Sequence, residues 1–241
     1  LGDAKEYRGS WIRTRVDEQG NTVNASKLLP ELQGSLLKQV DISGRLAGKA
    51  AAIYISPNAL VDHINVLAGA SIQGDIVSEY NQKDEQNNTR TTTVHFGLDS
   101  DANGQALSTG NKQFQFVYNG NIKGTNNLIL ATEGGITSLN GQQQVIALTV
   151  AQDSVLGGNG TYVLTPSQHG KFSNNGTLAP GNSIGKISID GDFSQSPTGT
   201  LLMEVDDQGQ HDVLSVTGAV NASGQLSLQP LAGWYGADWR V

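Results

Sequence analysis

The chain is a long series of short β-branched segments separated by tight-turn signals, and this pattern limits it to an all-β fold. From about Val40 onward the apolar runs are short and rich in Val, Ile and Leu, which favours strands over helices. Asn-Gly or Asp-Gly dipeptides lie between the runs, and these residues tolerate the positive φ of tight turns. The dipeptides begin at Asn103, Asn119, Asn140, Asn159, Asn175 and Asp190.

Such spacing is typical of a β-sandwich or of a β-solenoid, and two details favour the solenoid. Many runs are only about three residues long, as in Ile53–Ile55, which suits rungs that turn a corner after each strand. A degenerate repeat is also present, because the sequence Ala70–Ile76 is similar to Asn119–Thr125 and, more loosely, to Ser215–Val220. The two clearest copies lie about 46 residues apart, which corresponds to roughly two rungs.

The composition predicts a narrow core rather than a deep spherical one. Hydrophobic residues make up 37% of the chain, below the usual share of a globular domain, and aromatic residues make up only 6%. In a solenoid each rung buries an inward row of side chains on its neighbours, so stacking replaces a globular core. We therefore expect an interior lined by Val, Ile, Leu and Ala.

Three regions are expected along the chain. Residues 1–40 form an N-terminal segment that is denser in charge and to which the pattern assigns no single structure. Residues 41–157 are predicted to be rungs, with the polar run Asn81–Arg90 as a loop that protrudes from the solenoid. Residues 158–241 are predicted to be the C-terminal rungs and a cap.

Within the first region, Ser26–Gln39 fits either a helix or an irregular rung. Leu28, Leu32 and Leu36 follow a helical spacing of four residues, which would place them on one stripe. Gly34 weakens the middle of such a helix.

The charge and the absence of special segments restrict the partners of the chain. The net charge of −7 argues against nucleic acid, because phosphates are bound through clustered Lys and Arg, and the cluster Arg8, Arg13 and Arg15 is too short to reverse this. The lack of cysteine is consistent with two classes of protein: a cytosolic protein could lack cysteine by chance, and a secreted protein that crosses the outer membrane unfolded would gain from lacking it, because an early disulfide would lock a loop in the chain. No run approaches the roughly 18 apolar residues of a transmembrane helix, and no signal-peptide pattern is present.

The chain begins at Leu1 without Met and ends within an apolar run, so we expect a fragment of a longer protein.

The histidines do not form a recognisable catalytic or metal motif. His63, His95, His169 and His211 are widely scattered, and none has the spacing of a zinc motif, so we expect isolated polar or partly packed side chains. A Ser–His–Asp triad lacks its usual context, because no Gly-x-Ser-x-Gly elbow occurs.

Paired carboxylates raise the possibility of a carbohydrate-active enzyme, because glycoside hydrolysis needs two carboxyl groups roughly 5–10 Å apart. Residues at i and i+2 of one strand share a face at about 7 Å, so Asp190 with Asp192, or Glu204 with Asp206, would meet that distance. Both pairs lie beside turn glycines and no aromatic cluster accompanies them, so we do not expect catalysis. The remaining acidic groups are Asp84–Glu85, Asp99 with Asp101, and Asp207.

Two loops resemble ligand-binding motifs only in part. Asp99–Gln105 matches the first half of an EF-hand loop, but its twelfth position is Gly110 instead of a bidentate Glu, so we expect a loop without metal. Gly181–Lys186 has three residues rather than four between its glycines, and Ile187 follows the Lys, so it is not expected to bind phosphate. No cofactor is predicted.

The segment Asn175–Gly185 resembles the Gly-Thr-Leu-x-Pro-Gly-Asn-Ser-Ile-Gly signature near the C-terminal end of bacterial autotransporter passenger domains. Ile187–Gln195 resembles the strand-turn-strand that follows it in that family, and Asp212–Ala219 resembles the family's Asp-x-Leu-x-Val-x-Gly element. The match covers about Gly158–Leu228. The predicted folding motif consists of Gly176, Thr177, Leu178, Pro180, Gly181, Asn182, Ser183, Ile184 and Gly185.

The resemblance implies a right-handed parallel β-helix of type V secretion, whose C-terminal rungs form an autochaperone that folds first at the cell surface. A cap would come from Val213–Leu228, followed by Leu231–Tyr235 and Trp239. The implied partner is the outer-membrane β-barrel of the same parent chain, and the implied location is the bacterial surface or the medium. The leading hypothesis is therefore a non-catalytic stalk and folding nucleus. The alternatives are an adhesin that binds host glycans or other cells, for which Asn81–Arg90 is the motivating feature, and a carbohydrate-active β-helix enzyme.

Overall fold

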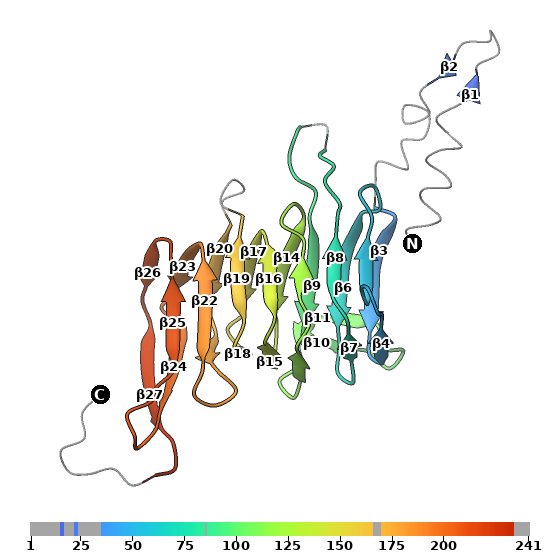
Figure 1. The fold of residues 1–241 in the computed structure, drawn as a ribbon. Helices are drawn as coiled ribbons and strands as arrows, with labels where there is room; N and C mark the ends of the chain where they lie inside the picture. The colour runs from blue at the N-terminus through green and yellow to red at the C-terminus, as the bar shows by residue number, and fades with distance from the viewer. Residues whose placement is uncertain (1–14, 17–21, 24–34, 85, 166–169, 234–241) are drawn as a thin grey trace.

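The computed structural model describes residues 15–16, 22–23, 35–84, 86–165 and 170–233, and residues 35–233 form a parallel β-helix (Figure 1). Three long parallel sheets of eight, seven and six strands run along the molecule. Each rung of the solenoid contributes one strand to each sheet that it passes through. Strands that are neighbours in a sheet therefore come from successive rungs. The prediction of an all-β solenoid is confirmed. Within the described part of the chain there is no helix of the length and apolarity that a membrane span requires.

The strands are short, as the sequence predicts. The eight-stranded sheet contains, in spatial order, β3 (Leu37–Ile42), β6 (Val61–Val66), β9 (Thr92–Phe96), β14 (Leu128–Thr132), β17 (Ala147–Val150), β20 (Lys171–Asn174), β23 (Asp192–Gln195) and β26 (Val220–Ala222). The seven-stranded sheet contains β5 (Ile53–Ile55), β8 (Ile76–Ser78), β13 (Ile122–Lys123), β16 (Gln142–Val145), β19 (Thr161–Leu164), β22 (Lys186–Asp190) and β25 (Val213–Val216). The six-stranded sheet contains β12 (Gln115–Tyr118), β15 (Gly135–Leu139), β18 (Ser154–Gly158), β21 (Thr177–Pro180), β24 (Thr200–Val205) and β27 (Gln225–Pro230).

Three two-stranded sheets complete the described strands. β4 (Arg45–Ala47) pairs in parallel with β7 (Ser71–Gln73). β10 (Leu98–Ser100) and β11 (Ala106–Gly110) form an antiparallel hairpin. β1 (Arg15–Val16) and β2 (Thr22–Val23) are also antiparallel.

The core is a set of rows that run along the axis of the solenoid. Strand register aligns one buried side chain per rung, and each such side chain contributes about 1.5–3 kcal/mol when fully buried. On the eight-stranded sheet this row is Ile64, Val94, Leu130, Leu148, Phe172 and Phe193. Large rings also stack in the middle of the molecule, where the centroids of Phe114 and Phe116 lie 6.0 Å apart and those of Phe116 and Tyr118 lie 6.2 Å apart.

The predicted repeat length is wrong. Ile122 on β13 pairs with Ile76 on β8, its neighbour in the sheet, so the two clearest copies of the repeat are one rung apart rather than two. This rung is long because two insertions interrupt it, the Asn81–Arg90 loop and the β10–β11 hairpin. The loop lies between β8 and β9 and extends beyond the sheets (Figure 1).

The two ends of the solenoid modify the sequence predictions. A helix over Ser26–Gln39 is wrong where the described residues reach it, because β3 already begins at Leu37, and residues 26–34 lie outside the described part. At the other end, the segment predicted as part of the cap forms β25, β26 and β27, which extend the three sheets by one more rung. Val220 and Leu226 continue the inward rows there and are 59% and 63% exposed. The aromatic residues of the predicted cap, Trp234, Tyr235 and Trp239, lie outside the described residues.

Candidate functional site

The turns that lead into the seven-stranded sheet stack along one edge of the solenoid, and we call this stack the corner column. It contains Gly74–Asp75, Asn119–Asn121, Asn140–Gly141, Asn159–Gly160, Gly181–Gly185 and Asp206–Asp212. The last five residues of the predicted folding motif, Gly181–Gly185, therefore form one corner of a longer structure. Hydrogen bonds that involve side chains link the corners to one another, so the column connects distant rungs.

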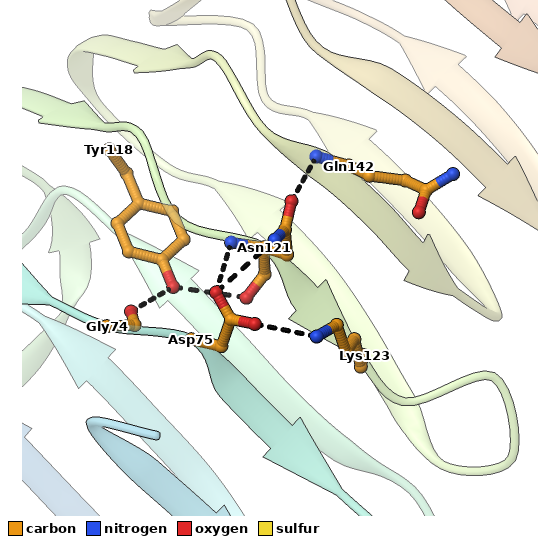
Figure 2. Close-up of polar contacts among 6 residues, drawn as sticks. All are labelled: Gly74, Asp75, Tyr118, Asn121, Lys123 and Gln142. Carbon is orange, nitrogen blue, oxygen red and sulfur yellow. Dashed lines mark hydrogen bonds and ion pairs between the residues drawn. The ribbon is translucent and has the colours of Figure 1, made fainter. Parts of the chain in front are cut away.

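The first part of the column is organised by Asp75 (Figure 2). One of its carboxylate oxygens accepts a hydrogen bond from Lys123 Nζ at 2.7 Å, and the other accepts one from the backbone N–H of Asn121 at 3.0 Å. These donors lower the pKa of Asp75 below its ordinary value. The Tyr118 hydroxyl donates to Gly74 O at 2.8 Å, and burial raises the pKa of this tyrosine. Asn121 Oδ1 accepts from the backbone N–H of Gln142 at 2.9 Å and so connects to the following rung.

The middle of the column is an asparagine ladder. Asn140 Nδ2 donates to Asn119 Oδ1 at 2.7 Å. Asn140 Oδ1 accepts from the backbone N–H of Asn159 at 3.0 Å and from Asn182 Nδ2 at 2.9 Å. Asn159 Oδ1 accepts in turn from the backbone N–H of Lys186 at 3.1 Å. One asparagine thus joins three other corners of the column.

The stacking explains the Asn-Gly dipeptides of the corner column, at Asn119, Asn140 and Asn159. The glycine after each of these asparagines lies against the backbone of the preceding rung. A Cβ on Gly141 would overlap the carbonyl oxygen of Gly120, and a Cβ on Gly160 would lie 2.7 Å from Leu139 O. The asparagine supplies hydrogen bonds between rungs, and the glycine allows the rungs to approach.

The predicted folding motif runs from one corner of its rung to the next. Gly176 precedes β21, in which Leu178 is fully buried and Thr177 and Ala179 are only partly buried. Gly181 follows the strand with φ of 92° and exchanges two backbone hydrogen bonds, of 2.9 and 2.8 Å, with Gly158 of the previous rung.

The rest of the motif forms the turn before β22. Asn182 and Ser183 are exposed, whereas Ile184 and Gly185 are partly buried. Asn182 reaches back to Asn140, two corners earlier in the column. Gly185 donates its backbone N–H forward to Asp212. The motif is therefore bonded both to upstream and to downstream rungs.

Asp212 is the residue that holds the motif to the following rung, and the sequence did not assign this role to it. The residue is buried, with 1% of its surface exposed. Oδ1 accepts from the backbone N–H of Gly185 at 2.8 Å, and Oδ2 accepts from the backbone N–H of Glu204 at 2.7 Å. Burial raises the pKa of Asp212 despite these donors, and burial together with the Asp212 charge raises the pKa of Glu204.

A second polar ladder lies inside the last rungs. Asn174 Nδ2 donates to Gln195 Oε1 at 3.0 Å, and both side chains point into the core. Gln195 Nε2 then donates to the carbonyl oxygen of Ser223 at 2.7 Å. The two residues have different roles at the end of β23, because Phe193 fills the apolar row while Gln195 bonds the next turn.

The prediction of isolated histidines is wrong for two of them. His63 Nδ1 lies 3.2 Å from His95 Nε2, and His95 Nδ1 lies 2.7 Å from Glu133 Oε1. His211 Nδ1 lies 2.8 Å from the carbonyl oxygen of Asp212. His169 lies outside the described residues.

The half EF-hand at Asp99–Gln105 is the turn of the β10–β11 hairpin. Asp101 Oδ1 accepts from the backbone N–H groups of Asn103 at 2.8 Å and of Gln105 at 2.9 Å. The same five-residue turn recurs at Asp84 and at Asp206, whose carboxylates also accept from the backbone two and four residues later. The Asp-x-Asn-Gly sequence at Asp101–Gly104 is therefore explained by turn formation.

The paired carboxylates do not have the arrangement that the enzyme hypothesis assumed. Asp190 ends β22 and Asp192 begins β23, so a corner at Gly191 separates them. Asp190 accepts from the Thr217 hydroxyl at 2.7 Å, and Asp192 accepts from a backbone N–H at 2.8 Å.

The second pair and the phosphate-loop resemblance are likewise explained by turns. Glu204 lies in β24, whereas Asp206 lies in the turn after it. Lys186 begins strand β22 and not a helix, so Gly181–Lys186 has no strand–loop–helix context.

Comparisons of the chain with protein-family models, with curated proteins and with solved structures found no match.

Proposed function

We propose that the chain is the non-catalytic β-helical stalk of a bacterial autotransporter passenger and that its C-terminal rungs are the nucleus from which it folds. Two observations support the proposal. The first is the resemblance of Asn175–Gly185 to the passenger motif, and the second is the set of hydrogen bonds that the buried Asp212 carboxylate accepts. This carboxylate bonds the last glycine of the motif and the backbone of β24 at the same time. The motif and the downstream element that resemble the family are thus one physical unit.

The physical basis of the proposal is the one-dimensional order of a solenoid. Most contacts of each rung are with its neighbours, so folding nucleates where rungs are held best and then spreads along the stack. Asn174, Gln195 and Asp212 add buried side-chain bonds between the last rungs. Asn182 extends this support upstream to Asn140. In the proposed role, the C-terminal rungs fold first, and their exposed strand edges are the template on which the upstream rungs form.

The proposed location is the bacterial surface or the medium, and the proposed partner is an outer-membrane β-barrel of the same parent chain. Folding from the C-terminal end would then begin next to the barrel and would favour outward movement of the chain.

Two matched truncations test the nucleus. Removal of residues 175–241 should abolish cooperative denaturant unfolding of the remaining rungs, as followed by circular dichroism and hydrogen exchange. Removal of residues 1–57, which takes away β1 to β5, should leave cooperative unfolding of the rest intact. If the fragment without 175–241 unfolds cooperatively at an unchanged midpoint, the nucleus proposal is wrong. The same truncations fused to an outer-membrane barrel would then measure delivery to the surface by protease accessibility.

A second candidate function is adhesion through the Asn81–Arg90 loop. The loop projects beyond the sheets and is shaped by its own turn, in which Asp84 accepts from the backbone N–H of Asn88 at 2.7 Å. Replacement of residues 81–90 by a short Gly-Ser link should abolish cell aggregation or host-cell binding without changing the circular dichroism spectrum. Unchanged binding by the loop-deleted protein would count against adhesion at this loop.

A further inference from the structure

Two histidines and a glutamate from successive rungs meet on the outer face of the eight-stranded sheet. His63 lies on β6 and His95 on β9, and the register pairs His95 with Asn65 and His63 with Thr93. The two imidazoles are therefore diagonal neighbours on adjacent parallel strands, with ring centroids 5.3 Å apart. Glu133 follows β14, the next strand of the same sheet.

Glu133 determines which nitrogen of His95 carries a proton. Its Oε1 lies 2.7 Å from His95 Nδ1, so Nδ1 is the protonated nitrogen that donates to the carboxylate. The side chains of His95 and Glu133 are only 18% and 25% exposed, which holds this pair in one orientation. In the neutral ring the lone pair is then on Nε2, the atom that faces His63 Nδ1 at 3.2 Å.

We propose that His63 Nδ1 and His95 Nε2 bind one divalent late transition-metal ion of the Zn²⁺ type, with Glu133 as the residue that orients His95. A hydrogen-bonded carboxylate behind a ligating imidazole is the usual support of a histidine ligand. With metal–nitrogen bonds of about 2.0–2.1 Å, nitrogens 3.2 Å apart subtend roughly 100° at the ion, close to a tetrahedral angle. Without metal, His63 Nδ1 donates to the His95 Nε2 lone pair; because His63 is exposed, its ring is free to take the tautomer with the proton on Nε2, which leaves the Nδ1 lone pair for the ion.

The ligand types also select the class of metal. Imidazole nitrogens suit Zn²⁺, Cu²⁺ and Ni²⁺, whereas Ca²⁺ and Mg²⁺ require oxygen ligands. Among the residues that the structure describes, no three His, Asp or Glu side chains are arranged to hold one ion, so water completes the coordination. The order of affinity follows from the metals themselves, with Cu²⁺ above Zn²⁺.

The first experiment titrates the metal-stripped, untagged protein with Zn²⁺, Cu²⁺ and Ca²⁺ by isothermal calorimetry. We expect one Zn²⁺ and one Cu²⁺ per chain at this site, with Cu²⁺ tighter, and no heat from Ca²⁺. His63→Ala and His95→Ala should both lose this binding, whereas the matched control His211→Ala should keep it. Zn²⁺ binding that persists at full affinity in His63→Ala would overturn the proposal.

Two further measurements separate ligation from structural roles. Glu133→Gln should weaken Zn²⁺ binding by roughly 10- to 100-fold while the protein stays folded, because the carboxylate only orients His95. The electron paramagnetic resonance spectrum of the Cu²⁺ complex should show coupling to two imidazole nitrogens in the wild type and to one in His63→Ala. Since His63 is exposed, this variant should keep the wild-type circular dichroism spectrum. Coupling to a single nitrogen in the wild type would contradict the two-histidine site.

Discussion

Asp212 accepts a hydrogen bond of 2.8 Å from the backbone N–H of Gly185, and this contact joins two elements that are separated in the sequence. Gly185 is the last residue of the predicted folding motif, and Asp212 is the first residue of the Asp-x-Leu-x-Val-x-Gly element. The other oxygen of the same carboxylate accepts from the backbone N–H of Glu204. One buried side chain therefore fixes the corner of one rung against the strand end of the next.

Replacement of Asp212 by Ala should destabilise the C-terminal rungs by about 3 kcal/mol, because it leaves the backbone N–H groups of Gly185 and Glu204 without their charged acceptor. The expected result is a lower denaturant midpoint and earlier hydrogen exchange in β22 and β24. Asp153→Ala is the matched control, because the Asp153 side chain is 66% exposed and its partner Lys112 lies 3.8 Å away at the surface. Equal midpoints for the two variants would show that Asp212 does not hold the corner.

Replacement of Glu204 by Gln should stabilise the protein at neutral pH and have no effect in acid. The folded-state pKa values of Glu204 and Asp212 are raised above 4.5 and 3.8. The folded protein therefore binds these protons more tightly than the unfolded chain, so stability is highest in acid and falls as pH rises through the raised values. The Glu204→Gln substitution removes the repulsion between the Glu204 charge and the neighbouring Asp212 charge. Unfolding midpoints of the variant and the wild type, measured from about pH 4 to 7, should converge in acid and diverge above it.

The parts of the fold that depend on local backbone geometry could be predicted from the sequence. Short β-branched runs and Asn-Gly dipeptides indicated strands and corners, because each corner needs a residue with unusual φ or no Cβ. The spacing between rungs could not be predicted, because it depends on insertions that lie outside the sheets. The pairing of Ile76 with Ile122 shows this, since the rung between them contains both a loop and a hairpin.

Contacts between rungs were the part of the candidate site that was hardest to predict from the sequence. His63 and His95 are 32 residues apart, and they meet only because the insertion between β8 and β9 returns the chain to the same sheet in a fixed register. The resemblance assigned Asp212 to the Asp-x-Leu-x-Val-x-Gly element, but its bonds to Gly185 and Glu204 could not be predicted, because they join corners and strands of two different rungs. The Asn-Gly dipeptides were a usable signal that went further than turn formation, since Asn119, Asn140 and Asn159 recur at similar spacing and form one ladder.

Replacement of Gly181 by Ala should cost clearly more stability than the same change at Gly104. Both glycines have positive φ, 92° and 78°, and this conformation alone costs an alanine about 1–2 kcal/mol. A Cβ on Gly181 would also overlap the carbonyl oxygen of Ser183, whereas a Cβ on Gly104 has nothing within 4 Å. We expect Gly181→Ala to lower the free energy of unfolding by about 3 kcal/mol or more. A midpoint for Gly181→Ala equal to that for Gly104→Ala would show that the corner relaxes without cost.

Replacement of Asp75 by Asn should have the opposite pH dependence to the Glu204 variant. Lys123 and the backbone N–H of Asn121 lower the folded-state pKa of Asp75 below 3.8, so the unfolded chain binds this proton more tightly. The stabilisation is therefore present at neutral pH and is lost as pH falls through the lowered value. Because Lys123 is 47% exposed, we expect a loss of about 1 kcal/mol for Asp75→Asn at pH about 7, which shrinks below pH about 4. Lys38→Met serves as a control, since Lys38 pairs with Asp62 at the surface with an 85% exposed side chain and should have almost no effect. A wild-type advantage over Asp75→Asn that persists undiminished in acid would contradict the role of the Asp75 charge in the corner column.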